Sequence, residues 1–501
     1  MVLQYSRPGN DESAFSSAKN LVEQIVQVLQ SKACLSASHG EVEHRIQKEG
    51  MEVLRLLFQG HLDHRSLSEP SLPKVPEAGH LERTYKREGT RRGLHSLFGT
   101  VHVHRKGYSA GCGDSVFPLD GQLNLSKDCY SDGLRRQASE LVSDLSFDKG
   151  VAHIRKGSAS MFPKRQMETV AQRVSVDFDA FYQTRQASDS LGSTDLLVLS
   201  CDGKGVVMRK EDLREATRKA AEVATHKKQT RLSKGEKRNR KRMATVAAVY
   251  DVAPHVRSPE SILGETERKG EPPKPENKRV WASVEKPSLE VIEAMFEEAL
   301  RRDPEQKRKW VILVDGQLTQ LQEIQRVQEQ LGIRAEVVVD FVHVLEYLWK
   351  AAYCFHAEES SEAEAWVKER ALKVLMGDAV QVAAGIRRSA TKRGLQSKRR
   401  RNADKCSDYL LKKKAYLRYD KALRKGYPIA TGVIEGACRY LVKDRMDITG
   451  ARWGLKGAEA ILKIRALVTS GDFEEYFAFH KQKERARNYP FYEAISFKMA
   501  A

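Results

Sequence analysis

The sequence predicts an α/β protein whose core is a mixed five-stranded sheet, preceded by a mainly helical region. Short apolar runs typical of buried strands alternate with helical patterns between residues 191 and 356. Before residue 93, apolar residues recur three and four positions apart, which is typical of helices. The chain also has 86 Lys and Arg against 67 Asp and Glu, a formal net charge of +19. This excess favours a polyanionic partner, and nucleic acid is the usual one.

The cysteines and the apolar runs bear on the compartment. Seven scattered cysteines form no C-x-x-C pair, which favours a reducing environment over a disulfide framework or a zinc ribbon. The first residues lack the basic and apolar segments of a secretory signal. No apolar run approaches the roughly 18 residues that a membrane span needs. We therefore expect a cytoplasmic protein that has no membrane partner.

The N-terminal half is predicted to consist of two regions. Residues 1–92 read as a helical region followed by a linker that contains Pro and Ser. Residues 93–190 read as a DNA-binding domain that begins with a β-hairpin. In this domain Val101 and Val103 alternate with polar residues, and the hairpin turn is expected near Lys106-Gly107.

The same domain contains a helix-turn-helix outline. A short helix with Ser146 as its N-cap is followed by a turn of Gly and Ser residues, and a longer helix begins near Pro163. In such modules the first residues of the second helix reach the bases, so Lys164, Arg165 and Gln166 are candidate DNA contacts. An ordinary helical hairpin explains the pattern equally well.

Residues 191–356 are predicted to form the α/β core. Their order is strand, turn, strand, a basic insertion at residues 226–243, strand, helix, strand, helix, strand and helix. Three strands followed by alternating helices and strands is the order of the ribonuclease H-like fold, whose mixed sheet begins with hairpin connections. A basic helical insertion at residues 357–427 and C-terminal helices at residues 428–501 complete the chain.

Four acidic residues occupy positions where a metal site could form. Asp202, Asp315 and Asp340 end the first, fourth and fifth predicted strands, and Glu435 lies in the first turn of a helix. Phosphoryl transfer on DNA uses two Mg²⁺ ions about 4 Å apart, which carboxylates hold. The first and fourth strands are neighbours in this topology, so Asp202 and Asp315 should lie side by side. Singly, each acid could be a turn residue, a helix cap or a favourable charge at a helix N-terminus.

Several stretches closely resemble bacterial insertion-sequence transposases of the ISKra type. They are FGTVHVHRKGY, FPKRQMET, LLVLSCDGKGVVMRK, RVWASVEK, LVDGQ, VVVDFVHVLEYLWK and PIATGVIEGACRYLVKDRMDITGARWG. The resemblance runs from about Gly93 to His480. Those proteins are DDE transposases with a ribonuclease H-like catalytic domain. The resemblance therefore implies a catalytic triad, held on metal, that includes Asp202 and Glu435.

For the second aspartate the resemblance leaves a choice. Related Mutator-type transposases have an Asp-Gly strand end followed by a [C/D]-x-x-H motif. Here Asp315-Gly316 is similar to the first feature, and the stretch from Asp340 to His343 is similar to the second. We therefore expect Asp315 in the triad with Asp340 as the alternative metal ligand. Asp340 and His343 would otherwise shape the site.

The resemblance also implies the reaction and the partners. The expected activity is binding of terminal inverted repeats, followed by strand cleavage and strand transfer of the insertion sequence into target DNA. Two Mg²⁺ ions, which Mn²⁺ is expected to be able to replace, would serve as cofactors. A homodimer or higher oligomer would form the synaptic complex, in the nucleoid of a bacterial cytoplasm. The alternatives are a catalytically silent, transposase-derived DNA-binding regulator and a ribonuclease H-like nuclease that cuts without joining.

Further basic and aromatic residues are candidate DNA contacts. Lys204 follows the first acid closely, although a solvated turn lysine is an equally good explanation. Trp453 would stack on a base, whereas packing between helices would also account for it. The other candidates are Lys227, Lys228, Arg238, Arg240, Arg439, Lys443, Arg445 and Arg452.

Overall fold

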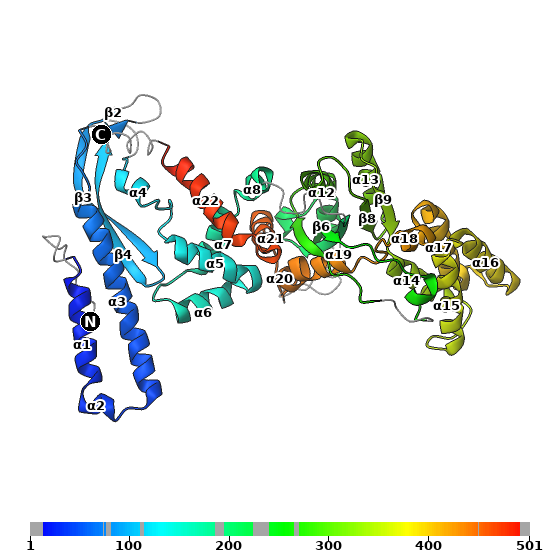
Figure 1. Cartoon of the computed structure of the whole chain (residues 1–501), viewed down its shortest axis with the longest axis horizontal. Helices are drawn as coiled ribbons and strands as arrows, with labels where there is room; N and C mark the ends of the chain where they lie inside the picture. Colours follow the sequence, from blue (N-terminus) through cyan, green and yellow to red (C-terminus); the bar gives the residue numbers. More distant parts are fainter. Residues whose placement is uncertain are drawn as a thin grey trace. The chain divides into compact units, whose positions relative to one another are not determined.

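The computed structural model describes residues 14–73, 75–76, 82–110, 115–185, 195–223, 240–264, 270–448 and 450–490 of the chain. It divides into two compact units (Figure 1). The first comprises Met1–Gln183 together with Asp472–Ala501, and the second comprises Thr184–Gly471. No helix among the described residues is long and apolar enough to cross a membrane.

The first unit begins with a helical hairpin and a β-hairpin. Helix α1 (Ser16–Leu29) is followed by the short α2 (Lys32–Leu35) and the long α3 (His39–Leu67). Strands β3 (Tyr85–Ser96) and β4 (Gly99–Ser109) pair antiparallel, and a small second pair consists of β1 (Val75–Pro76) and β2 (Glu82–Arg83). The C-terminal part of α3 packs on β4, where Leu62 joins a core with Leu94, Val101, Val103, Leu119 and Leu125.

The turn of the β-hairpin lies at Leu97-Phe98, so its predicted position at Lys106-Gly107 is wrong. Ser96 pairs with Gly99 and closes the loop: its hydroxyl donates to the Gly99 carbonyl at 2.8 Å and accepts from Phe98 N–H. Gly99 adopts a φ of 122°, which favours glycine. Gly107 lies inside β4 because the Phe117 ring packs against it, and an added Cβ would approach that ring to 2.7 Å. The glycine thus marks close packing rather than a turn.

In the rest of the first unit, α6 and α7 pack against α5. Ser131 and Ser146 cap α5 and α6 by accepting backbone N–H bonds, as predicted for Ser146. The C-terminal helix returns to this unit, where Glu484 forms an ion pair with the fully buried Arg135 and the ring Nδ1 of His480 lies 2.7 Å from Asp177. The helices are α4 (Pro118–Gln122), α5 (Asp132–Asp144), α6 (Phe147–Gly157), α7 (Lys164–Val174), α8 (Phe178–Thr184) and α22 (Phe473–Asn488).

The second unit is built on a mixed five-stranded sheet, which confirms the predicted α/β core. Its strands lie in the order β7-β6-β5-β8-β9. The β7-β6 and β6-β5 pairs are antiparallel, and the β5-β8 and β8-β9 pairs are parallel. The strands are β5 (Leu196–Val207), β6 (Lys241–Val252), β7 (Glu276–Ser283), β8 (Trp310–Val314) and β9 (Glu336–Val339).

The predicted strand-turn-strand at the start of the core is wrong. Residues 196–207 form the single strand β5, which pairs with β6 along its whole length. Gly203 and Gly205 stay in the strand, because β6 packs close to them: an added Cβ at Gly205 would come within 2.7 Å of Lys241. The third strand of the sheet is β7, which includes the stretch RVWAS. The sheet therefore still has the five strands that were predicted.

Helices pack around the sheet. Helix α12 lies against β5 and β6, α21 against β7, and α19 against β5 and β6. The helices of the core are α9 (Glu215–Val223), α11 (Pro259–Ile262), α12 (Ser288–Arg302), α13 (Leu318–Leu331), α14 (Phe341–Ala352), α19 (Gly432–Ala437), α20 (Asp444–Met446) and α21 (Leu455–Ser470), with a 3₁₀ turn η2 (Lys210–Asp212).

The stretch between β9 and α19 is helical, as predicted for the insertion. Figure 1 shows its helices gathered beside α14 at one end of the second unit. The contact of α14 with α17 joins them to the core. These elements are α15 (Ser361–Leu375), α16 (Ala379–Lys392), α17 (Ser397–Lys413), the 3₁₀ turn η3 (Lys414–Tyr416) and α18 (Tyr419–Arg424).

Candidate active site

Asp202 lies within β5 rather than at the end of a strand, which corrects the prediction. It pairs with Val246 of β6, but β8 pairs with β5 only as far as Ser200, which is opposite Leu313. Asp202 therefore projects past the end of β8, and its side chain is half-buried. Its sequence neighbour Cys201 is fully buried, as are the residues of β5 that precede it.

Asp315 is the first residue after β8 and lies at the level of Asp202. Ser200 pairs with Leu313, and each aspartate is two residues further along its strand. The Ser200 hydroxyl donates to the Leu313 carbonyl at 2.5 Å and ties the strands together there. Asp315 is half-buried, and its Oδ1 accepts from Gln317 N–H at 2.9 Å. The predicted adjacency of the first and fourth strands is thus present.

Asp340 follows β9 directly and is completely buried. Its Oδ1 accepts from Val342 N–H at 3.1 Å, which caps α14, and from Thr431 N–H at 3.3 Å. Its Oδ2 is buried and has no hydrogen-bond partner among the described residues. Burial raises the pKa of Asp340, and the nearby carboxylate of Glu435 raises it further.

Glu435 lies in the first turn of α19, and its side chain is exposed. The Thr431 hydroxyl donates to its Oε1 at 3.0 Å. Directly after α19 the chain forms a π-helical segment, η4 (Cys438–Lys443). Such segments are rare and often occur at functional sites. At its first residue the Cys438 thiol donates to Asp202 Oδ2 at 3.2 Å, and burial together with the Asp202 charge raises the pKa of this thiol.

The short segment from Thr431 to Cys438 therefore links three of the four acids. Thr431 bonds to both Asp340 and Glu435, and Cys438 bonds to Asp202. The register of β5 and β8 adds the fourth acid, Asp315. The structure thus places all four predicted carboxylates near the carboxyl ends of the parallel strands β8 and β9. Among the described residues, however, no three His, Cys, Asp or Glu side chains already stand as a group that could hold a metal ion.

Two residues of α17 interact with Asp315. The Tyr409 hydroxyl donates to the Asp315 carbonyl at 3.2 Å, and its ring stacks on Tyr347 with the centroids 4.1 Å apart. Lys413 is buried, which lowers its pKa, while the Asp315 carboxylate opposes that shift. The Asp315 charge thus favours the positively charged form of this amine, which burial disfavours.

The predicted DNA-contacting residues that the structure describes fall into three groups. Lys164, Arg165 and Gln166 are exposed at the start of α7, where Lys164 pairs with Asp148 at 2.7 Å. In the second unit, half-buried or exposed candidates are Lys204, Arg240, Arg439, Lys443 and Arg452. Lys227, Lys228 and Arg238 lie outside the described residues.

The third group, Arg445 and Trp453, is buried. The Trp453 indole N–H donates to the Met446 carbonyl at 2.9 Å, and the Arg445 guanidinium lies over the indole, 4.9 Å from the ring centroid. Only 2% of Arg445 and 7% of Trp453 is exposed. This environment favours the packing interpretation of Trp453. His343 lies half-buried in the first turn of α14.

Sequence reasoning missed Thr431, Cys438, Tyr409 and Lys413. Thr431 and Cys438 lie four residues before and three after Glu435, so helical spacing around the predicted acid could have indicated both. Tyr409 and Lys413 lie four residues apart on α17, but nothing in the sequence connects that helix with Asp315. Their place at the site depends on tertiary packing alone.

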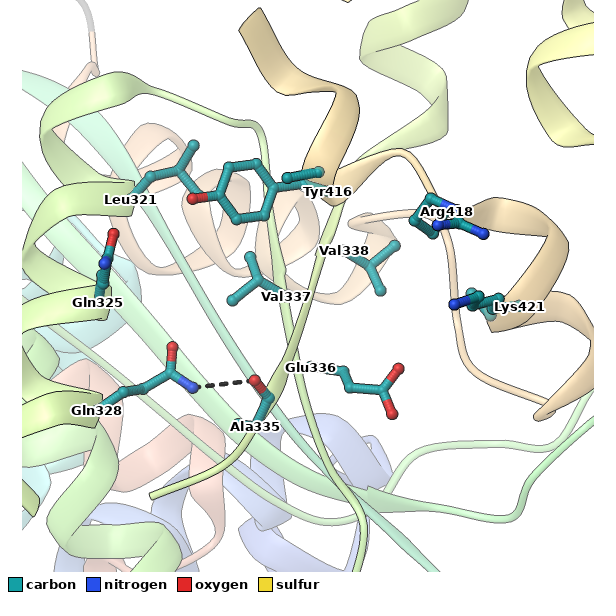
Figure 2. A pocket seen from close by; sticks show the side chains of 12 residues that line it. Leu321, Gln325, Gln328, Ala335, Glu336, Val337, Val338, Tyr416, Arg418 and Lys421 are labelled. Carbon is teal, nitrogen blue, oxygen red and sulfur yellow. Dashed lines mark hydrogen bonds between the residues drawn. The ribbon is translucent and has the colours of Figure 1, made fainter. Parts of the chain in front are cut away.

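A groove of about 550 Å³ follows the outer edge of β9 (Figure 2). Its side chains come from α13, β9 and the segment from η3 to α18. The Gln328 amide donates to the Ala335 carbonyl at 2.9 Å, and the Tyr419 hydroxyl donates to the Val339 carbonyl at 2.7 Å. These bonds satisfy carbonyls that an edge strand would otherwise expose. None of the four candidate carboxylates lines the groove, so it is separate from the candidate active site.

No family model and no curated protein matches the chain.

Proposed function

We propose that the protein is a DDE transposase of the ISKra type, which cleaves and joins DNA at the ends of an insertion sequence. The observation that carries the proposal is that four acids lie near the carboxyl ends of the parallel strands. Asp202 and Asp315 lie at the same level of neighbouring parallel strands, and the segment from Thr431 to Cys438 connects Glu435 and Asp340 to Asp202. Acids far apart in sequence rarely gather at one edge for structural reasons alone, since like charges repel.

The strand order supports a ribonuclease H-like core. The first strand of the sheet, β5, is central, with the antiparallel β6 and β7 on one side and the parallel β8 and β9 on the other. Ligands of open α/β sheets bind beyond the carboxyl ends of the parallel strands. Asp315 and Asp340 lie at those ends, directly after β8 and β9.

The donor set suits Mg²⁺ or Mn²⁺. These ions prefer oxygen ligands, and Asp202, Asp315 and Glu435 supply carboxylates, with Asp340 as the alternative to Asp315. The buried Oδ2 of Asp340, which has no hydrogen-bond partner among the described residues, would be a further oxygen ligand. The bonds from Cys438 to Asp202 and from Thr431 to Glu435 would have to yield when ions bind. Bound at these acids, two ions would supply Lewis-acid stabilisation of the attacking and leaving oxygens.

The protein's own residues would bind and orient the DNA. Lys204, half-buried two residues after Asp202, and Lys413, near Asp315, bring positive charge to the acids, where phosphate oxygens would otherwise be repelled. Exposed Arg439 and Lys443 extend this charge along η4. In the first unit, the exposed Lys164, Arg165 and Gln166 at the start of α7 suit a recognition helix of a helix-turn-helix.

The test is joining of a pre-cut inverted-repeat end to target DNA in Mg²⁺ by full-length protein. We expect Asp202→Asn and Glu435→Gln to bind the end within about threefold of the parent protein but to lose joining by roughly 10³-fold, because several kcal/mol of transition-state stabilisation depends on the metal site. The matched control is Glu297→Gln, which neutralises an exposed acid of α12 in the same unit and should join normally.

The alternatives predict other outcomes. A silent DNA-binding regulator would bind ends but show no joining in the parent protein, in Mg²⁺ or in Mn²⁺. A nuclease would cut the end without joining it. If Asp202→Asn joins as well as the parent, the assignment of the carboxylate site is wrong.

A further inference from the structure

The helical hairpin at the start of the first unit exposes several large apolar side chains. Helix α1 has only one buried residue, Ala18. Val22 and Val26, one turn apart on α1, are 44% and 46% exposed. On α3, Ile46 and Leu57 are 47% and 42% exposed. Singly exposed apolar residues are ordinary, but a series at helical spacing indicates an interaction surface.

These residues form a stripe that faces one side of the hairpin. Ala18, Leu21 and Ile25 are the more buried residues of α1, and Gly60 of α3 contacts the start of α1. Advancing around each helix axis in the same sense leads from this contact to the exposed stripe. Because the two helices run antiparallel (Figure 1), equal rotations bring both stripes to the same side. We call Val22, Val26, Ile46 and Leu57 the apolar stripe.

The charge of the hairpin differs from that of the chain. Between Ala14 and Leu57 there are five Lys or Arg residues and five Asp or Glu residues, so this segment is neutral in a chain of net charge +19. A surface meant for DNA would carry part of that excess. Neutral, mixed-charge surroundings instead let an apolar surface meet a copy of itself without repulsion between like charges.

We infer that the apolar stripe binds the apolar stripe of a second copy of this chain, so that two hairpins pack as a four-helix arrangement around a twofold axis. Such an interface is self-complementary, and neutral flanks with apolar residues on both helices fulfil that requirement. The inference stands on the stripe itself and does not require catalysis. It extends the proposed function, because joining two transposon ends requires at least two copies of the chain.

The experiment measures self-association of full-length protein without DNA by sedimentation equilibrium. We compare the parent with Val22→Glu/Val26→Glu and with Val22→Lys/Val26→Lys. Each variant alone should associate at least about tenfold more weakly than the parent, because like charges would face each other across the twofold axis. An equimolar mixture of the two variants should recover dimers, since opposite charges then meet.

Controls separate this result from misfolding. Val256→Glu and Val256→Lys change a residue that is 64% exposed in the second unit and should leave association unchanged. Circular dichroism and binding of a single DNA end report folding and the proposed function independently of self-association. A monomeric parent, a variant that dimerises as the parent does, or a mixture that stays monomeric would each overturn the inference.

Discussion

Asp315 and Asp340 occupy equivalent positions on neighbouring parallel strands, yet their environments differ. Val314 pairs with Val339, and each aspartate is the next residue of its strand. Asp315 stays half-buried, whereas Asp340 is fully buried, accepts two backbone N–H bonds and caps α14. A place at the end of a strand therefore does not by itself decide what an acid does.

The residue that follows each aspartate accounts for the difference. Gly316 adopts a φ of 87°, which turns the chain away from the strand and delays the helix until Leu318. An added Cβ there would come within 3.2 Å of Val339. Phe341, in contrast, is the first residue of α14, so the Asp340 carboxylate caps the first turn of this helix. Asp315 therefore remains accessible to a ligand, whereas Asp340 stabilises the fold as a helix cap.

The largest expected effect is on catalysis by Asp315→Asn. If Asp315 is the second acid of the triad, this variant should lose end joining by roughly 10³-fold, as Asp202→Asn does. Asp340→Asn keeps an N-cap side chain and should lose no more than about tenfold. The measurement is the single-turnover rate of joining a pre-cut end in Mg²⁺, with end binding as the control for folding.

The reverse order of these two rates would exchange the roles of the two aspartates. Joining that is normal in Asp315→Asn and lost in Asp340→Asn would make Asp340 the metal ligand, despite its burial. Equal losses in both would mean that the two acids act as a unit.

A smaller effect is expected on stability, in the opposite order. Asp340→Ala removes the acceptor for Val342 N–H and Thr431 N–H, so the free energy of unfolding should fall by about 1–2 kcal/mol. Asp315→Ala removes one acceptor, for the exposed Gln317 N–H, and should cost about 0.5 kcal/mol or less. The five tryptophans at positions 281, 310, 349, 366 and 453 all lie in the second unit, so tryptophan fluorescence in urea reports on that unit alone. A larger loss in Asp315→Ala than in Asp340→Ala would contradict the assignment of Asp340 to the fold.

The sequence predicted the acids and the sheet better than their local surroundings. Apolar runs that end in acids identified β8, which is buried along its whole length, and β9, whose last two residues are buried. The same reasoning failed at Asp202, where Asp-Gly is typical of a hairpin turn but lies within β5. Glycine next to an acid can also occur within a strand where a neighbouring strand packs too closely for a side chain. Here side chains of β6 occupy the space that a Cβ would take. That requirement depends on tertiary pairing, which local patterns do not contain.

The candidate site shows the same limit. Its four acids were predicted from strand ends and from a resemblance, but the residues that connect them were not. Thr431 donates its backbone N–H, and Cys438 its thiol, to acids that are 91 and 236 residues away in sequence. Buried Arg445 and Trp453 show the converse, because basic and aromatic residues near the predicted acid proved to pack against each other. Residue type and spacing predict candidates, and burial separates those that are accessible to a ligand from those that are not.

The smallest expected effect is a pH dependence of stability that arises at Asp340. Burial, with the Glu435 charge, raises its pKa in the folded protein above the ordinary 3.8. The folded state then binds the proton more tightly than the unfolded chain, so this contribution to stability is fully present below pH 3.8 and is lost as the pH rises through the folded-state pKa. Asp340→Asn cannot ionise, so its free energy of unfolding relative to the parent should increase from pH 4 to pH 7. A difference that stays constant from pH 4 to pH 7 would contradict the raised pKa of Asp340.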